Sequence, residues 1–241
     1  MKIKRIIQAQ KSQVIAHRGY WKTAGSAQNS ITSLQKADSI HCYGSEFDVW
    51  LAKDNKLVVN HDPVYKMKYM EYSKGDALTG LKLSNGENLP SLQKYLEAGK
   101  KCNTKLILEL KAHNSKKRET KAVQEILAMV KKMGLEDRME YITFSLHAMK
   151  EFIRLAPAGT PVFYLNGELS PKELKDLGAA GLDYHMGVIK KHPEWIKEAH
   201  DLGLKVNVWT VDKAEDMKWL IDQKVDFITT NEPIVAQDML K

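Results

Sequence analysis

The sequence lacks several features that mark common protein classes. It has only two cysteines in 241 residues, Cys42 and Cys102, and their separation matches no metal-binding pattern. No stretch approaches the roughly 20 consecutive apolar residues that a membrane-spanning helix needs. Each cysteine directly precedes an expected strand, so a disulfide would require the two strand starts to be neighbours. We therefore expect two buried free thiols and no integral membrane segment.

The N-terminal segment also lacks the pattern of a secretory signal. Residues 2–13 are basic and polar, and no apolar core follows Met1. We expect no signal peptide in this chain, which leaves the compartment open: cytoplasmic, or extracytoplasmic if a signal has been trimmed. The connections between elements contain no Pro/Ser-rich break. The chain is therefore predicted to form a single domain over residues 1–241.

The charge balance is basic but diffuse. Lysine and arginine outnumber aspartate and glutamate by 37 to 30, which gives a formal net charge of +7. No basic segment carries the interleaved aromatic residues that bind single-stranded nucleic acid. A positive field attracts anionic small molecules, phosphates included. We therefore expect a small anionic ligand and no nucleic acid, while the oligomeric state stays unknown.

Short runs rich in β-branched residues alternate with amphipathic segments, a rhythm typical of a parallel sheet. Eight strands are expected at residues 14–19, 46–52, 105–111, 139–145, 162–166, 181–187, 205–211 and 226–232. This pattern predicts an α/β fold, a single (β/α)8 TIM barrel. The connection after the second strand, at about 53–88, is longer than the others and is interpreted as a short insertion into the barrel. A doubly wound open sheet is the alternative, but no glycine-rich phosphate loop follows the first strand.

Seven helices are expected between the strands, and none after the last strand. They cover residues 28–40, 89–101, 118–134, 145–156, 170–178, 192–203 and 212–223. Ser91, Ser170 and Asp212 are the expected N-terminal caps of three of them. Gly134, Gly178 and Gly203 are expected to end helices, where a left-handed residue is useful.

The active site of such a barrel lies at the carboxyl ends of its strands. Because residues i and i+2 of a strand face the same way, Glu46 and Asp48 should converge, as should Glu109 and Lys111. The other polar or aromatic residues at strand ends or in their extensions are His17, Arg18, His61, Asp62, Trp209, Asn231 and Glu232. Taken one at a time, these residues could be a buried histidine, a structural ion pair or ordinary surface acids, none of which indicates a function. Gathered at one mouth, they indicate a functional site.

The composition of this set indicates phosphoryl chemistry. Its three carboxylates offer only oxygen ligands, which suit one hard divalent cation, Mg²⁺ or Ca²⁺, better than zinc. Its two histidines are then free for proton transfer. Arg18 and Lys111 supply positive charge for an anion, and the arginine fork is well shaped for two phosphate oxygens.

An ordered series of short motifs carries a family resemblance. HRG, NS, EFDV, VVNHD, LELK, VWTV and DFITTNEP follow one another from about Val14 to Pro233, nearly the whole chain. In this series the sequence resembles the glycerophosphodiester phosphodiesterase family, barrel enzymes related to phosphatidylinositol-specific phospholipases C. The resemblance implies metal-dependent hydrolysis of a small-molecule glycerophosphodiester to glycerol 3-phosphate and an alcohol.

The resemblance also implies roles for the residues at matching positions. Glu46, Asp48 and Glu109 would bind the divalent cation. His17 and His61 would form the acid–base pair around an internal glycerol nucleophile and a cyclic phosphate. His17 is assigned as base and His61 as acid, and the reverse assignment stays open.

Substrate contacts are implied in the same way. Arg18 and Lys111 would hold phosphate oxygens, Asn29 would orient the metal or phosphate shell, and Trp209 would pack against the glycerol. One departure matters, because the family usually has glutamate where this chain has Gln28. The missing negative charge is expected to weaken the cation site or to change what is bound there.

Two alternative functions stay open. One is a phospholipase-type lyase that stops at the cyclic phosphate. The other is a non-catalytic phosphodiester-binding protein, which the intact histidine pair disfavours. His113 and His185 could border the mouth, and the Met- and Tyr-rich residues 64–72 are expected to pack the insertion onto the barrel rather than to form a lid. The alcohol headgroup is not determined by these patterns.

Overall fold

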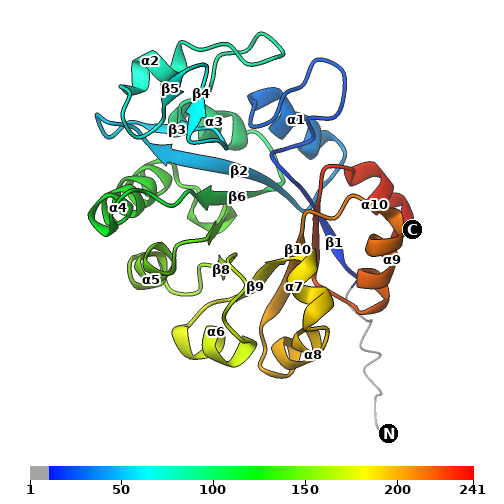
Figure 1. Cartoon of the computed structure of the whole chain (residues 1–241). Helices are drawn as coiled ribbons and strands as arrows, with labels where there is room; N and C mark the ends of the chain where they lie inside the picture. The colour runs from blue at the N-terminus through cyan, green and yellow to red at the C-terminus, as the bar shows by residue number, and fades with distance from the viewer. Residues whose placement is uncertain (1–10) are drawn as a thin grey trace, which may run out of the picture.

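The computed structural model of the chain describes residues 11–241, which form a closed barrel of eight parallel strands (Figure 1). The N-terminal residues on which the signal-peptide prediction rests lie mostly outside the described range. The first strand of the barrel pairs with the last, Ala16 with Thr230, and also with the second, Ile15 with Gly44. These two pairings close the sheet, so the predicted (β/α)8 barrel is confirmed and the open doubly wound sheet is wrong.

All eight predicted strands are present. They are β1 (Gln13–Ala16), β2 (Gly44–Leu51), β6 (Lys105–Leu110), β7 (Met139–Thr143), β8 (Val162–Tyr164), β9 (Gly181–His185), β10 (Lys205–Trp209) and β11 (Phe227–Thr230). Side chains of β2 alternate as a two-sided strand requires: Phe47 and Val49 pack in the layer between barrel and helices, whereas Glu46 and Asp48 alternate with them. The period-two alternation thus sends the acids of β2 away from the outer apolar layer.

The seven predicted helices are also present and surround the barrel (Figure 1). They are α1 (Ile31–Ser39), α3 (Leu92–Gly99), α4 (Lys116–Met133), α5 (Leu146–Leu155), α6 (Pro171–Leu177), α8 (Glu194–Asp201) and α9 (Ala214–Asp222). Three short helices were not predicted: α2 (Gly75–Thr79), α7 (Met186–Lys191) and α10 (Pro233–Met239). Helix α10 corrects the expectation that no helix follows the last strand; its N-terminal residue offers no side-chain cap that would have signalled it.

The predicted helix caps are confirmed except at one position. The side chains of Ser91 and Ser170 accept hydrogen bonds from the backbone N–H groups of their first turns. Asp212 does not cap α9, which begins after Lys213 without a side-chain cap. Its carboxylate instead accepts hydrogen bonds from residues at the end of β11, because the barrel brings the ends of β10 and β11 together.

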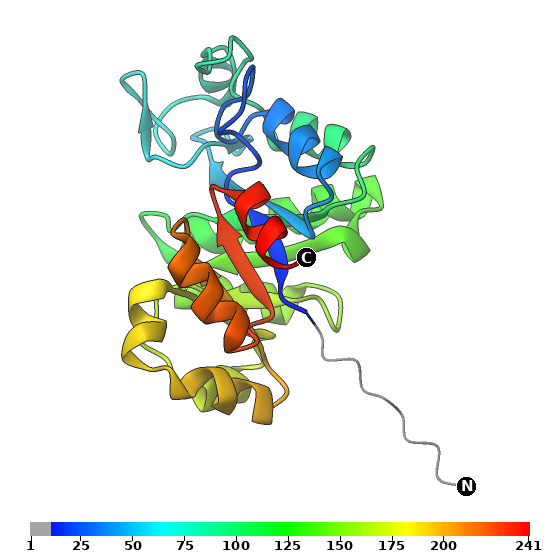
Figure 2. The same ribbon diagram turned by 90° about the vertical axis from the view of Figure 1, so that its right-hand side faces the viewer.

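The insertion after β2 contains β3 (Leu57–Val59), the hairpin β4 (Val64–Tyr65) and β5 (Lys68–Tyr69), and α2. Strand β3 runs antiparallel to β2, and the turn between them uses Asn55 at φ 64°, a left-handed value that asparagine tolerates. Figure 2 shows the β4–β5 hairpin projecting from one end of the molecule beside the β1–α1 loop. The antiparallel return positions the chain beyond Val59 next to the carboxyl end of β2.

The insertion packs only in part as expected. Met70 is fully buried in a small apolar cluster of the insertion that also contains Trp50 and Leu78. Met67, Tyr69 and Tyr72 are 93%, 57% and 62% exposed, so for these three side chains the expected packing onto the barrel is wrong.

The prediction for the cysteines is confirmed. Cys42 and Cys102 are both buried and free, as predicted. Within residues 11–241, no helix has the length and apolar character needed to cross a membrane.

Candidate active site at the barrel mouth

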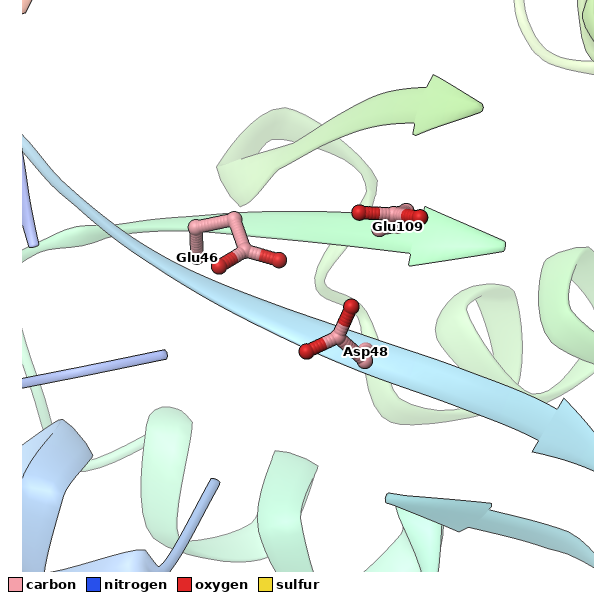
Figure 3. Close-up of side chains that lie close together, drawn as sticks. All are labelled: Glu46, Asp48 and Glu109. Atoms are coloured by element: carbon pink, nitrogen blue, oxygen red, sulfur yellow. The ribbon is translucent and has the colours of Figure 1, made fainter. Parts of the chain in front are cut away.

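Three carboxylates converge where β2 and β6 run side by side. Asp48 and Glu109 are paired in register, and Glu46 lies two residues earlier on β2. Ligand oxygens of the three side chains all lie within 4.8 Å of one another, and all three side chains are buried. Figure 3 shows them around a common space between the two strands. The predicted convergence of Glu46 and Asp48 is therefore found, with Glu109 added from the neighbouring strand.

Three buried carboxylates at this distance repel one another when ionised, and this repulsion shifts their pKa values. Burial, followed by the charge of Asp48, raises the pKa of Glu46 well above its usual range. The same two causes raise the pKa of Glu109 to about 7. Burial alone would raise the pKa of Asp48 as well, but Lys111 and other neighbouring positive groups hold it below its usual value. Without a cation, the cluster therefore favours the protonated forms of the two glutamates more than isolated side chains would.

Lys111 lies among the carboxylates. Its Nζ is 2.8 Å from Glu109 Oε1 and 3.3 Å from Asp48 Oδ1. Burial alone would lower the pKa of Lys111, but these two carboxylates outweigh burial and raise it. The predicted same-face arrangement of Glu109 and Lys111 is present, and the ammonium group lies against Glu109 and Asp48.

The donor set fits a hard divalent cation. Three carboxylates supply oxygen ligands of the kind that Mg²⁺ and Ca²⁺ prefer. Glu46 Oε1 is buried and accepts no hydrogen bond from any of the residues 11–241. A buried carboxylate oxygen without a donor is costly unless something positive compensates it. Glu46, Asp48 and Glu109 therefore form a set that could hold a metal ion.

The cluster predicts a pH-dependent stability for the cation-free protein. The folded pKa of Glu109, about 7, lies above its ordinary value of 4.5, so the folded state keeps a proton that the unfolded state has released. In a chelator, the contribution of this proton to the free energy of unfolding should fall as pH rises from about 5 to about 7, by at most about 1.4 kcal/mol per pH unit. Mg²⁺ or Ca²⁺ should oppose the fall, because a cation favours the ionised carboxylates.

Denaturant unfolding at several pH values, with chelator or with cation, measures this slope. Glu109→Gln should remove the Glu109 contribution and so change the slope, whereas Glu97→Gln, a matched change of an exposed acid, should leave the slope as it is in the unmodified protein. An equal slope in both variants would contradict the assignment.

His17 is held by a polar chain that starts at Asp212. Asp212 accepts hydrogen bonds from the Asn231 side-chain and backbone N–H groups, both at 2.8 Å. Asn231 Oδ1 in turn accepts from the indole N–H of Trp21 at 3.0 Å and lies 2.9 Å from His17 Nδ1. The side-chain N–H group of Asn231 is used by Asp212, and the atom that faces His17 is the amide oxygen, which can only accept a hydrogen bond. Nδ1 of His17 therefore carries the proton of the neutral ring. Burial, with the charge of Arg18 next, lowers the pKa of His17 to about 4.

Asn231 was noted at the end of the last strand, but no role was predicted for it. Nothing in the sequence pairs it with His17, which is 214 positions away. Closure of the barrel brings β1 and β11 together, and the network follows from that closure.

The loop after β1 is bent by residues in left-handed conformations, among them Arg18, Gly19 and Asn29. Arg18 has φ 56°, and its backbone N–H donates to Glu46 Oε2 at 2.8 Å. Gly19 follows at φ 77°, where any side chain would collide with Ser33. Asn29, at φ 58°, donates from Nδ2 to Asp48 Oδ2 at 2.9 Å and accepts from the Asp48 backbone N–H at 3.1 Å. The strained backbone thus places donors on the carboxylates of β2.

Gln28 contacts Arg18 and not the carboxylates. Its Oε1 accepts from Arg18 Nη1 at 2.7 Å. The arginine Nε is 3.8 Å from Asp48 Oδ2. The neutral side chain therefore leaves the charge of Arg18 uncompensated on the solvent side.

His61 borders two adjoining hollows. The first is an inner cavity of about 200 Å³, lined also by His17, Glu46 and Glu109. The second is an outer groove of about 450 Å³ between the β1–α1 loop and the insertion, where Trp21, Lys22 and Tyr65 are among the lining residues. His61 Nδ1 is 2.7 Å from Asp62 Oδ1, which leaves Nε2 as the free ring nitrogen. The structure thus brings both predicted histidines to the cavity that the acids line.

The far wall of the inner cavity is mostly apolar, with one acid that the sequence reading missed. Ile142, Phe144 and Trp209 line it, and the Trp209 indole N–H donates to the backbone carbonyl of Asp183 at 2.9 Å. Asp183 also lines the cavity and is 2% exposed. Burial, then the charge of Glu109, raises its pKa well above the usual range. Its signal in the sequence was an acid inside a strand whose other residues are apolar or aromatic.

The two histidines proposed to border the mouth do not line the inner cavity. His113 Nε2 accepts from the Leu51 backbone N–H at 2.9 Å, and its Nδ1 lies 2.6 Å from the Lys111 carbonyl. It therefore links the ends of β2 and β6. His185 accepts from the Gly187 N–H and packs its ring edgewise on Trp209, 5.0 Å between centroids.

A closed barrel that gathers buried acids and two histidines at the carboxyl ends of its strands has the architecture of a (β/α)8 enzyme. Within that class, residues 17–235 match the model of the glycerophosphoryl diester phosphodiesterase family. The chain belongs to this family. Membership in this family identifies it as a phosphodiesterase, as the sequence resemblance implied.

Individual relatives agree with this assignment. A glycerophosphodiester phosphodiesterase of Caldanaerobacter subterraneus subsp. tengcongensis is 27% identical over 238 residues, covering 92% of this chain and 95% of the relative. The crystal structure of a glycerophosphodiester phosphodiesterase from Parabacteroides distasonis is 52% identical, with TM-score 0.94, covering 96% of this chain and 97% of that one. An Oleispira antarctica phosphodiesterase, solved with the product sn-glycerol-3-phosphate, shares the fold at 22% identity, TM-score 0.81 and 95% and 96% coverage.

Proposed function

We propose that the protein hydrolyses glycerophosphodiesters to glycerol 3-phosphate and an alcohol, with one divalent cation, Mg²⁺ or Ca²⁺. The observation that carries the proposal is the shared inner cavity, onto which two histidines and the buried acids Glu46 and Glu109 open from separate elements. The Oleispira antarctica relative holds the product that this reaction would give. A cavity of about 200 Å³ suits a ligand as small as glycerol phosphate.

Glu46, Asp48 and Glu109 would hold the cation. When bound, the cation would supply Lewis-acid stabilisation of the charge that develops on the phosphoryl oxygens. Asn29 would keep Asp48 in place through its paired hydrogen bonds.

Arg18 and Lys111 would hold phosphate oxygens. The guanidinium of Arg18 is anchored by Gln28 and lines the cavity. Lys111 would contribute from its position among the acids, where a cation would take over part of its contact with Asp48. Trp209 would pack on the glycerol carbons from the apolar wall.

The two histidines would divide the proton transfers. His17 is neutral at pH 7, and with its Nδ1 proton committed to Asn231, its Nε2 lone pair would accept the proton of a glycerol hydroxyl. That oxygen would attack phosphorus while the bond from phosphorus to the alcohol oxygen breaks. His61, which also borders the outer groove, would donate the proton that the departing alcohol needs. Water would then open the cyclic phosphate with the two roles reversed.

The layout also favours a place for the alcohol. The outer groove meets the inner cavity at His61, the proposed proton donor to that alcohol. The groove is therefore the proposed site for the alcohol headgroup, and residues of the insertion that line it, such as Tyr65 and Leu83, would influence which headgroup is accepted.

A panel of glycerophosphodiesters that differ in the alcohol, incubated with Mg²⁺ or Ca²⁺, tests the proposal. Phosphorus NMR would follow the substrate, the cyclic phosphate and glycerol 3-phosphate in one sample. Release of glycerol 3-phosphate that a chelator stops and added cation restores is the expected result. Accumulation of the cyclic phosphate would indicate the lyase alternative. Binding without turnover for every headgroup would indicate a non-catalytic binder.

A further inference from the structure

A buried acid without a complete set of partners lines the inner cavity, on a strand that carries none of the three clustered carboxylates. Asp183, on β9, is 2% exposed and lines the cavity. The Asn207 side chain hydrogen-bonds to its carboxyl group, and Asn207 is itself fixed by Thr229 at 3.0 Å. Asp183 Oδ1, however, has no hydrogen-bond partner anywhere in residues 11–241. A buried polar atom left in this state is destabilising unless a ligand or water completes it.

The surroundings of Asp183 do not explain it as a structural group. Its strand neighbours Leu182 and Tyr184 belong to the outer apolar layer, so Asp183 alternates to the inside of the barrel. Glu140, another buried acid of the barrel, bonds to the hydroxyl of Tyr43 and does not line the cavity. Asp183 differs from it in keeping one oxygen available at the cavity.

The cavity has two chemically different sides. His17, Arg18, Glu46 and Glu109 provide charge and proton transfer on one side. Ile142, Phe144, Leu165 and Trp209 provide apolar surface on the other side, where Asp183 is the one ionisable residue beside them. A phosphodiester at the charged side would extend its glycerol carbons along this surface.

From this arrangement we infer that Asp183 forms a hydroxyl-binding subsite, which recognises the terminal hydroxyl of the substrate glycerol. The inference rests on the proposed function, since that function places a glycerol group in the cavity. The hydroxyl at C2 is committed to attack on phosphorus, so the terminal hydroxyl is the one that remains free. Asp183 acts as a specificity-determining group, and the part of the substrate that it binds is the uncharged polyol, not the phosphate.

The expected consequence is discrimination against substrates that lack this hydroxyl. A site built to hydrogen-bond a substrate hydroxyl rejects the deoxy analogue strongly, because the buried polar group is then left unpaired. The matched substrates are glycerophosphocholine and its 1,2-propanediol analogue, which keeps the C2 hydroxyl and has a methyl group at the terminal carbon. We expect kcat/KM of the unmodified protein to favour the glycerol substrate by about 100-fold or more.

Asp183→Leu should reduce this preference to within about threefold, mainly by slowing the glycerol substrate. Asp183→Asn, which can still hydrogen-bond a hydroxyl, should keep a preference of at least about tenfold. Glu140→Gln is the control for changing a buried barrel acid, and it should leave the preference unchanged. Circular dichroism and thermal melting check that each variant folds; if Asp183→Leu does not, Asp183→Ala is measured with the same expectation.

Calorimetric binding of glycerol 3-phosphate and of 1,2-propanediol phosphate, which has a methyl group at the terminal carbon, gives a readout that does not depend on turnover. The unmodified protein should bind the glycerol compound more tightly, and Asp183→Leu should bind the two alike. Equal affinity and equal kcat/KM in the unmodified protein, or an undiminished preference in Asp183→Leu, would overturn the inference. Absence of turnover on every diester would instead overturn the proposed function, and the binding comparison would still decide the role of Asp183.

Discussion

Replacing His17 by alanine should lower kcat for glycerophosphodiester hydrolysis by about 10²–10⁴-fold, the range typical of a lost general base. The reason is the hydrogen-bonded chain from Asp212 through Asn231, which fixes the ring and leaves Nε2 as the proton acceptor. KM should change much less, because phosphate contacts are assigned to other side chains. Steady-state kinetics with saturating cation measure both constants.

A substrate with a better leaving group separates the two histidines. If His17 is the base, His17→Ala should be slow on glycerophosphocholine and equally slow on the p-nitrophenyl diester of glycerol phosphate. If His61 is the acid, His61→Ala should recover most of its rate on the p-nitrophenyl substrate, since that leaving group needs no proton. The opposite pattern would reverse the assignment. His192→Ala, a change of a half-buried histidine that pairs with Glu194 and does not line the cavity, should leave both rates unchanged.

Asp48→Asn should abolish cation-dependent turnover, with a fall in kcat/KM of about 10³-fold or more. Asp48 is at the centre of the cluster: it is 1% exposed, bonded to Asn29 and close to Lys111. The amide keeps the shape of the side chain but removes the negative charge that a divalent cation needs. The outcome depends on charge rather than on packing, because a hydrogen-bonding side chain of the same size is retained.

Two measurements test this prediction together. Turnover should be lost, and the increase in melting temperature that Mg²⁺ or Ca²⁺ gives the unmodified protein should disappear, because ligand binding stabilises only the state that binds. Asp176→Asn, on an exposed helix face beside Lys172, is the matched control and should keep both properties. A variant that retains the thermal response to cation but loses turnover would show that Asp48 serves the reaction without holding the ion.

The order of elements and the site on β2 and β6 could be predicted because they depend on local periodicity. Eight β-branched runs separated by amphipathic segments define the barrel, and two-residue alternation places Glu46 with Asp48 and Glu109 with Lys111. Helix α10 was missed although Pro233 occupies its first turn, where proline is favoured; no side-chain cap accompanies it.

Partners that are distant in sequence were not predictable in this way. Asp212 was expected to cap a helix, but closure of the barrel places its carboxylate on Asn231 and, through it, on His17. The exposed side chains of Met67 and Tyr69 depended on how the insertion folds back, which no periodicity encodes.

The sequence by itself therefore determined which residues face the inside of the barrel and which end of it carries the chemistry, because side-chain direction in a strand follows from position. Only the tertiary structure decided which of these groups meet across the barrel. It placed Lys111 among the acids and left one oxygen of Asp183 without a partner at the cavity. The physical reason is that contacts between strands depend on the register and closure of the whole sheet, which are set by all eight strands together.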